Sequence, residues 1–240
     1  MPPRTAVIIP TLNEAEAIGA VVAEIARGGV ERIIVADGGS TDATAERAVS
    51  AGAQFLAAGR GYGRACLAGA LAASDAELLV FMDGDGADDP KSIGALIAPL
   101  IAGQKDFVLG SRVRGHAAKG SLGPHQRWAG RGFGLAMRLL YGANYTDMCA
   151  LRAIPRDVLL SLGMTEMTYG WNLEMQMRAA RARLRILEIP VDNRHRLGGQ
   201  SKVAGSLRGS LRAGARILGA FGRQVLAPAP ARSPRQELRP

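Results

Sequence analysis

Short, nearly continuous apolar runs alternate with alanine-rich stretches through the first half of this 240-residue chain. Runs of this kind are typical of strands that are buried on both faces of a parallel sheet. We expect strands at residues 6–9, 32–35, 54–56, 78–82, 106–109 and 185–191. Helix-starting signals lie between them, at Asn13, at Thr41 or Asp42, and after the glycines at 59–63. The alternation predicts an α/β fold with a mostly parallel sheet and with ligand-binding loops at the carboxyl ends of its strands.

The second half of the chain is expected to add helices at 127–140 and 170–183, followed by a segment with two opposite faces. On a helical wheel, residues 206–226 place arginines on one side and apolar residues on the other. Such a helix either lies on an anionic membrane surface or packs on its own domain, and the sequence leaves both alternatives open. Residues 227–240 contain four prolines and no apolar pattern, so we expect a disordered tail.

Composition excludes several classes of protein. The chain is 48% hydrophobic, which is too apolar for a wholly disordered protein. Cys66 and Cys149 are too far apart in the sequence for a metal knuckle, and two cysteines make no disulfide framework, so a reducing cytoplasm is expected. We see neither a signal-peptide core nor an apolar run of bilayer-spanning length.

Charge is divided unevenly along the chain. Residues 1–110 hold 8 Lys and Arg against 14 Asp and Glu, whereas residues 111–240 hold 22 against 7. Most of the cations are arginines, whose planar guanidinium group matches phosphate oxygens. A phosphate-bearing ligand is one interpretation of the basic half. Arginines placed on solvated faces by codon bias are the other, which composition alone favours, so the positions of the arginines must decide. A nucleic-acid-binding module is the alternative from another class, and it is disfavoured because no recognition motif is present.

Two acidic loops follow expected strands. Asp37 begins the loop at 37–42, where a carboxylate can accept hydrogen bonds from a base or a ribose; taken alone, a carboxylate at this place is more typical of a turn. The loop at 83–89 carries four aspartates, which repel one another unless a cation lies among them. Oxygen ligands select a hard ion, so we expect Asp83 and Asp85 to hold Mg²⁺ or Mn²⁺. Asp88 and Asp89 precede Pro90 and are expected to start a helix.

A glycine-spaced segment at 59–65 opens the third expected helix. It contains Arg60, Gly61, Tyr62 and Gly63, and such a helix N-terminus can hold an anion. The alternative is a turn in which the glycines serve packing.

These motifs, in this order, resemble those of the family 2 glycosyltransferases of GT-A fold, and most closely the polyprenyl-phosphate (dolichyl-phosphate) hexosyltransferases. The resemblance covers about residues 5–203 and implies a Rossmann-like GT-A catalytic domain over residues 1–203, with residues 204–226 as an appended amphipathic, basic helix. The matching segments are residues 9–14, 37–42, 60–63, 82–85, 110–112 and 196–202.

The resemblance implies roles for particular residues. The nucleotide sugar would be held by Pro10, Asn13, Glu14, Asp37, Arg60, Gly61 and Asp83. The acceptor phosphate would be surrounded by Ser111, Arg112, Arg127, Arg194, Arg196, Ser201 and Lys202. Asp85 would be catalytic through the metal, and Asp147 or Glu174 would serve as base if the acceptor were a hydroxyl; their alternative is a hydrogen-bonded structural role.

The function implied is metal-dependent, inverting transfer of a hexose from a nucleotide sugar of the UDP-glucose or GDP-mannose type to a polyprenyl phosphate. Because a phosphate monoester is largely ionised at neutral pH, we expect no essential general base. The enzyme alternative is a family 2 transferase acting on a soluble hydroxyl, and another is a membrane-surface module without catalysis.

Three departures from the family pattern have consequences. Ala87 stands where many lipid-phosphate members carry a polar residue, and Gly38 replaces a commoner Asp. The transmembrane helices of some members have no counterpart in this sequence. We therefore expect a cytoplasmic protein that is peripheral to the inner face of the membrane, with a membrane-embedded protein as a possible partner.

Overall fold

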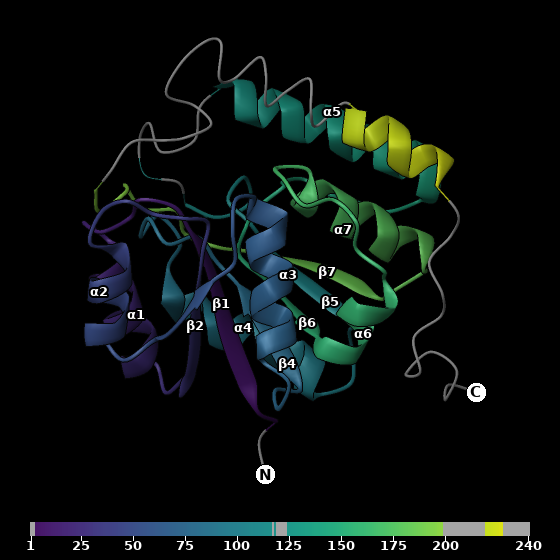
Figure 1. Ribbon diagram of the computed structural model, residues 1–240. Coiled ribbons are helices and arrows are strands. Elements are labelled where there is room, and N and C mark those ends of the chain that lie inside the picture. Colours follow the sequence, from purple (N-terminus) through teal and green to yellow (C-terminus); the bar gives the residue numbers. More distant parts are fainter. Residues whose placement is uncertain (1–2, 117, 119–123, 199–218, 228–240) are drawn as a thin grey trace.

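The computed structural model describes residues 3–116, 118, 124–198 and 219–227, with only the backbone described for 124–129. A seven-stranded sheet forms the centre of this part of the chain (Figure 1). Its strand order is β3-β2-β1-β4-β6-β5-β7. The strands are β1 (Thr5–Thr11), β2 (Arg32–Asp37), β3 (Gln54–Ala57), β4 (Leu78–Phe81), β5 (Phe107–Ser111), β6 (Arg152–Pro155) and β7 (Ile186–Pro190).

Helices cover both faces of the sheet, and each face has its own apolar core. They are α1 (Ile18–Arg27), α2 (Thr44–Ser50), α3 (Tyr62–Ala72), the 3₁₀ turn η1 (Pro90–Ser92), α4 (Ile93–Ile101), α5 (Pro124–Tyr141), α6 (Arg156–Ser161) and α7 (Trp171–Arg181). Ile8 of β1 lies in one core with α3, α5, α6 and α7, whereas Val7 and Ile9 lie in the other with α1, α2 and α4. This burial on both faces explains why the strands are continuous apolar runs.

Two local predictions were wrong. Asn13 does not start α1, which begins at Ile18; Asn13 has a left-handed φ of 53° and its side chain accepts from the N–H of Thr41. β6 was not predicted, and it runs antiparallel between β4 and β5. Its first residue, Arg152, is completely buried and donates to the carbonyl oxygens of Cys149, Ala150 and Asn172. These hydrogen bonds offset the unfavourable burial of a charge, and an apolar sequence pattern gives no sign of such a strand residue.

The described end of the chain packs on its own domain. Residues 219–226 are helical, and Ala220 is 1% exposed. Gln224 donates to Glu174 of α7 at 2.7 Å, and Arg223 pairs with Glu166 at 2.7 Å. For these residues the packing alternative is therefore the observed one. The rest of the expected amphipathic helix, the boundary at 203/204 and the tail from 228 lie outside the described residues. Within the part that is described, every helix is too short or too polar to cross a bilayer.

Candidate active site

The two acidic loops meet at the carboxyl edge of the sheet, as the order of the strands predicts. β1 lies between β2 and β4, and its last residue, Thr11, is in register with Asp37 at the end of β2. Asp83 and Asp85 follow the end of β4 on the other side of β1. The three aspartates therefore flank the end of one central strand, which is the usual position of a ligand site in an open α/β sheet.

Three carboxylates crowd together in the loop after β4. Asp88 is 4% exposed and accepts from the backbone N–H of Asp83 at 3.1 Å. Burial, together with the negative charges of Asp88 and Asp85, raises the pKa of Asp83 to about 8. Burial also raises the pKa of Asp88 to about 6. The cluster is short of positive charge. The prediction that Asp88 starts a helix was wrong, whereas Asp89 does cap η1 by accepting from Lys91 N.

Asp85 has a cationic partner from a distant part of the sequence. Its Oδ2 pairs with the guanidinium of Arg196 at 2.5 Å, and its Oδ1 accepts from Ala87 N at 2.9 Å. The backbone N–H groups of Leu197 and Arg194 donate to the carbonyl oxygens of Asp85 and Ala87. The segment around Arg196 is therefore held over the acidic loop. Two residues that the sequence assigned to different ligands, Asp85 to the metal and Arg196 to the acceptor phosphate, here bind one another.

Asp37 and its neighbours form an ordered turn. Its carboxylate accepts from Gly39 N, Ser40 N, Ser40 Oγ and Thr11 Oγ1. Asp37 is 4% exposed, so the turn role considered for it is what the structure describes, and contact with a nucleoside stays a prediction.

The other predicted donor-side residues lie at the same edge. Pro10 precedes Thr11 in β1, where it is buried, and Glu14 lies close behind with 7% of its surface exposed. Asn13 is tied to the Asp37 loop from both sides, since its backbone N–H donates to Ser40 Oγ. The loop after β1 and the loop after β2 therefore form one hydrogen-bonded unit.

The glycine-spaced segment is a packing turn rather than a free anion cradle. The N–H groups of Gly63 and Arg64 donate to the carbonyl oxygens of Thr168 and Met167. A side chain at Gly61 or Gly63 would collide with the backbone at Met167 or Glu166, which explains the glycines. In this conformation the N–H groups of Gly63 and Arg64 are therefore not available to an anion, and contact between Gly61 and the nucleotide sugar stays a prediction. Arg60 is exposed.

Tyr62 connects this turn to the acidic cluster, and the sequence analysis assigned it no role. Its hydroxyl donates to Asp83 Oδ1 at 3.2 Å. Burial and the charge of Asp83 raise the pKa of Tyr62 well above its usual range, so the hydroxyl stays a donor. The sequence signal that could have identified Tyr62 is its position between Gly61 and Gly63, which pack the start of α3 against the loop at 166–168.

A buried ion pair organises the basic side of the edge. Arg112, directly after β5, makes a bidentate pair with Asp147, with N–O distances of 2.8 Å. Asp147 also accepts from the backbone N–H groups of Arg112 and Met148. Ser111 is completely buried and its hydroxyl bonds that of Thr146 at 2.6 Å. In this conformation the side chain of Ser111 therefore stabilises the loop, and its contact with an acceptor stays a prediction.

The remaining predicted residues lie apart from this pair. Arg194 makes a bidentate pair with Glu24 of α1 at 3.0 Å. Glu174 is completely buried and accepts from Thr165, Glu166, Arg178 and Gln224. The hydrogen-bonded structural role is therefore the one that the structure describes, and a base role stays a prediction. The side chain of Arg127 is not described, and Ser201 and Lys202 lie outside the described residues.

The acidic cluster fits a divalent cation only in part. Among the described residues, no three His, Cys, Asp or Glu side chains already converge as a metal site. Asp83 and Asp85 supply two carboxylates, and the raised pKa values of Asp83 and Asp88 show that added positive charge would relieve the cluster. The donor set, oxygen only, suits a hard ion whose remaining ligands come from elsewhere.

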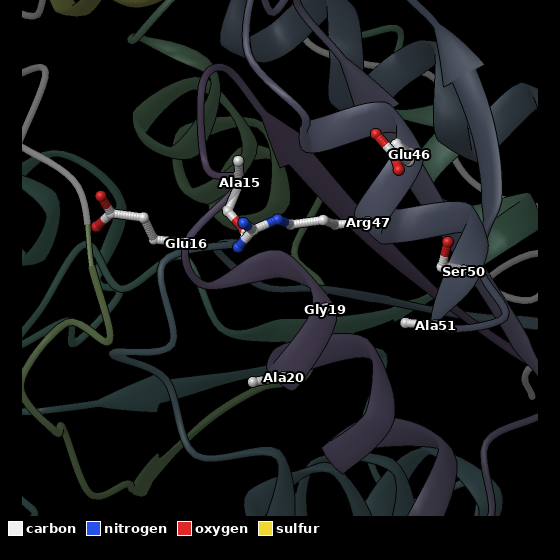
Figure 2. Close-up of a pocket in the computed structure, with 8 residues that line it drawn as sticks. All are labelled: Ala15, Glu16, Gly19, Ala20, Glu46, Arg47, Ser50 and Ala51. Carbon is white, nitrogen blue, oxygen red and sulfur yellow. Dashed lines mark hydrogen bonds between the residues drawn. The ribbon is translucent and has the colours of Figure 1, made fainter.

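A separate cleft of about 320 Å³ lies between α1 and α2 (Figure 2). It is lined by Ala15, Glu16, Gly19, Ala20, Glu46, Arg47, Ser50 and Ala51. Arg47 donates to the carbonyl oxygen of Ala15 at 2.9 Å, which joins the two helices. None of the lining residues belongs to the acidic cluster or to the Arg112–Asp147 pair, so the cleft is no part of the candidate site.

Comparison with known proteins agrees with this geometry. The model of the glycosyl transferase family 2 matches residues 6–163. An uncharacterized glycosyltransferase of Mycobacterium tuberculosis is 38% identical over 85% of this chain and 92% of its own length. The undecaprenyl-phosphate mannosyltransferase of Micrococcus luteus is 31% identical over 86% of this chain and 90% of its own. A crystal structure of glucosyl-3-phosphoglycerate synthase from M. tuberculosis with Mn²⁺, UDP-glucose and phosphoglyceric acid has a TM-score of 0.76 at 24% identity, covering 94% of this chain and 81% of that one.

Proposed function

The chain belongs to glycosyl transferase family 2 and is a glycosyltransferase of GT-A fold, and we propose that it transfers a hexose from a nucleotide sugar to a polyprenyl phosphate. The donor is of the UDP-glucose or GDP-mannose type, and the anomeric centre is inverted. The observation that carries the proposal is the crowded aspartate cluster at the carboxyl edge of the sheet, where Arg196 from the basic half of the chain pairs with Asp85.

Asp83 and Asp85 would hold Mg²⁺ or Mn²⁺ together with the diphosphate of the donor. When bound, the cation stabilises the negative charge that develops on the leaving diphosphate. Tyr62 orients Asp83 through its hydroxyl, and Ala87 N orients Asp85. Arg196 must release Asp85 for the carboxylate to turn to a cation, and the released guanidinium is then free for the acceptor phosphate.

The acceptor needs no protein base. The second pKa of a phosphate monoester is ~6, so its oxygen is already a nucleophile at neutral pH. Asp147 and Glu174, which sequence reasoning considered as bases, are both hydrogen-bonded within the protein: Asp147 holds Arg112, and Glu174 holds the loop before α7. Their engagement supports an acceptor that arrives ionised.

Similarity favours a lipid acceptor over a soluble one. The M. luteus relative, whose name states an undecaprenyl-phosphate acceptor, matches over nearly the whole length of both chains. A soluble acceptor is the second candidate, because the structural neighbour was crystallised with phosphoglyceric acid. At 24% identity that neighbour supports the fold alone.

One assay with competing acceptors tests the proposal. The full chain is incubated with Mn²⁺ and UDP-glucose or GDP-mannose, and with undecaprenyl phosphate, 3-phosphoglycerate or glucose as acceptor. We expect a lipid-extractable phosphoglycoside with one of the donors. Transfer to 3-phosphoglycerate or glucose alone would overturn the lipid acceptor while leaving the transferase standing. No donor-dependent transfer or donor hydrolysis would overturn the donor assignment.

A lipid acceptor also implies a place for the protein. We propose that it works at the cytoplasmic face of the membrane, attached peripherally to anionic lipid, and that a membrane-embedded protein receives its product. The excess of cations in the second half of the chain supports this proposal.

A further inference from the structure

Exposed leucines and arginines lie together on the outer face of α5. Leu135 is 60% exposed and Leu139 is 76% exposed, one helical turn apart. Arg131 and Arg138 are also exposed. They lie on the same side of the helix as the leucines, because Arg131 is four residues before Leu135 and Arg138 is three residues after it. Two large apolar side chains that protrude together are unusual on a surface with no partner.

The opposite face of α5 is firmly attached to the domain. Phe133 stacks on Tyr145 with ring centroids 6.0 Å apart, and Met137 is completely buried. Added side chains at Gly130 and Gly134 would meet the carbonyl oxygens of Thr146 and Tyr145. The helix is therefore anchored along one face, and packing on the described part of the chain does not explain the exposed leucines.

The anchoring segment leads directly to the basic side of the candidate site. Tyr145 and Thr146 precede Asp147, which holds Arg112. α5 thus lies against the same short segment that positions a predicted acceptor-binding arginine, and it crosses one end of the molecule (top of Figure 1). A surface that meets a membrane at this place brings the membrane close to the acceptor side.

The charge of α5 and its flanks selects the kind of membrane. Between Asp106 and Asp147 the sequence has no Asp or Glu, and it has six Lys and Arg. Three of these, Arg127, Arg131 and Arg138, belong to α5. Exposed leucines between arginines, with no acid nearby in the sequence, match a bilayer surface of anionic lipid, where the apolar side chains enter the acyl boundary and the guanidinium groups meet phosphates.

We propose that the face of α5 formed by Arg131, Leu135, Arg138 and Leu139 docks the protein on an anionic bilayer. The inference rests on the proposed function, because the docking would serve to deliver a lipid acceptor. The contact with the bilayer can nevertheless be tested without any acceptor. The docking face is distinct from the segment at 206–226 that sequence analysis considered for this role.

The experiment measures flotation of the full chain with vesicles of phosphatidylcholine alone or mixed with phosphatidylglycerol. We expect wild type to float with the mixed vesicles, and the double variant Leu135→Glu/Leu139→Glu to bind them about tenfold more weakly. The matched control is Leu71→Glu/Ile101→Glu, with leucine and isoleucine 53% and 50% exposed near the carboxyl ends of α3 and α4, at the other edge of the sheet. It should float like wild type. Leu135→Gln/Leu139→Gln, which adds no charge, should also weaken binding.

Several outcomes overturn the docking face. The docking face is wrong if the wild-type protein does not float with the mixed vesicles, or if the double variants float as well as the wild type. It is also wrong if vesicle binding of the control variant is weakened as much as that of the α5 variants. A wild-type dimer in light scattering that the Gln variant converts to monomer, with flotation unchanged, would assign the face to a second copy instead. The proposed function fails separately: if wild type floats through α5 but glycosylates no prenyl phosphate in detergent, the docking inference stands and the lipid acceptor does not.

Discussion

The acidic loop after β4 and the basic side around Arg112 lie at one edge of the same sheet, but they balance charge in opposite ways. In the acidic loop, Asp85 pairs with Arg196, whereas burial and neighbouring negative charges raise the pKa values of Asp83 and Asp88. On the basic side, Arg112 has a carboxylate of its own, Asp147. Arg194, which belongs to the same segment as Arg196, is likewise paired, with Glu24.

The difference indicates what each side requires. The acidic loop is incomplete without additional positive charge, whereas the basic side is complete in the absence of a ligand and must exchange partners to bind a phosphate. Arg196 belongs to both, because it is a cation from the basic half that lies on the acidic loop. The experiments below test this contrast, beginning with the largest expected effect.

Asp85→Asn removes charge from the acidic loop at the position where we expect the metal. Transfer should fall by about 10³-fold, because a charge that acts on the leaving group in the transition state is lost. The variant should stay folded, since an uncharged side chain in a crowded acidic cluster relieves repulsion. Hexose transfer at saturating donor and Mn²⁺ measures the effect, and thermal unfolding is the control. Wild-type turnover would remove Asp85 from the mechanism.

Asp147→Asn breaks the pair on the basic side, and its main effect should be on stability. Removing one partner of a buried ion pair leaves the other charge uncompensated, and with Arg112 partly exposed we expect a loss of about 2–3 kcal/mol in the free energy of unfolding. Urea denaturation measures it. Glu24→Gln is the matched control, because the Glu24–Arg194 pair is more exposed and should contribute less than about 1 kcal/mol. A stable variant that has lost transfer would instead identify Asp147 as a base.

The raised pKa values of the acidic loop predict a pH dependence of stability. Between the unfolded pKa of 3.8 and the folded pKa of about 8, the native state keeps a proton on Asp83 that the unfolded chain has released. Stability should therefore fall as pH rises through this window, by about 1–2 kcal/mol between pH 5 and pH 8 in EDTA. Urea midpoints at both pH values measure it.

The double variant Asp83→Asn/Asp88→Asn should flatten this slope because it removes the titrating carboxyl groups, and Mg²⁺ should flatten it because a cation compensates their buried negative charge. A flat profile for the metal-free wild type would show that the carboxylates are better solvated than their burial indicates.

The contrast between the two sides also marks what the sequence can reveal. The acidic loops were predictable together because parallel strands bring their carboxyl ends to one edge. The order that places β1 between β2 and β4 was not part of the prediction. The Asp85–Arg196 pair was not predictable, because its partners are far apart in the sequence and meet only when the chain is folded. Ser111 was assigned by its motif, but burial, which a motif does not report, turns its hydroxyl inward.

Single positions show the same limit. Asp88 and Asp89 are adjacent and equally suited to start a helix, yet only Asp89 does so. Asp88 instead accepts from the backbone N–H of Asp83, inside the loop. The glycines at 61 and 63 gave a correct signal of close backbone approach, but the approaching group is the loop at 166–168 rather than a phosphate.

Arg196→Gln produces the smallest effect and the one most specific to the contrast. Arg196 pairs with Asp85 in the absence of ligands, so removing its charge frees that carboxylate. Mn²⁺ should then bind about threefold to fivefold more tightly, a modest effect because the pair is partly exposed. Electron paramagnetic resonance of free Mn²⁺ measures this without turnover. The acceptor concentration needed for half-maximal transfer should rise in the same variant, so the two ligands respond in opposite directions.

Arg194→Gln is the control for that variant, since it removes the same charge from the same segment but from a residue paired with Glu24. If both variants tighten Mn²⁺ equally, the effect is the general field of the basic segment and not the pair. If Arg196→Gln leaves Mn²⁺ binding unchanged while acceptor binding weakens, Arg196 serves the acceptor alone. An opposite shift of the two affinities in Arg196→Gln only is the result that a shared cation requires, because the guanidinium can neutralise Asp85 or the incoming phosphate but not both.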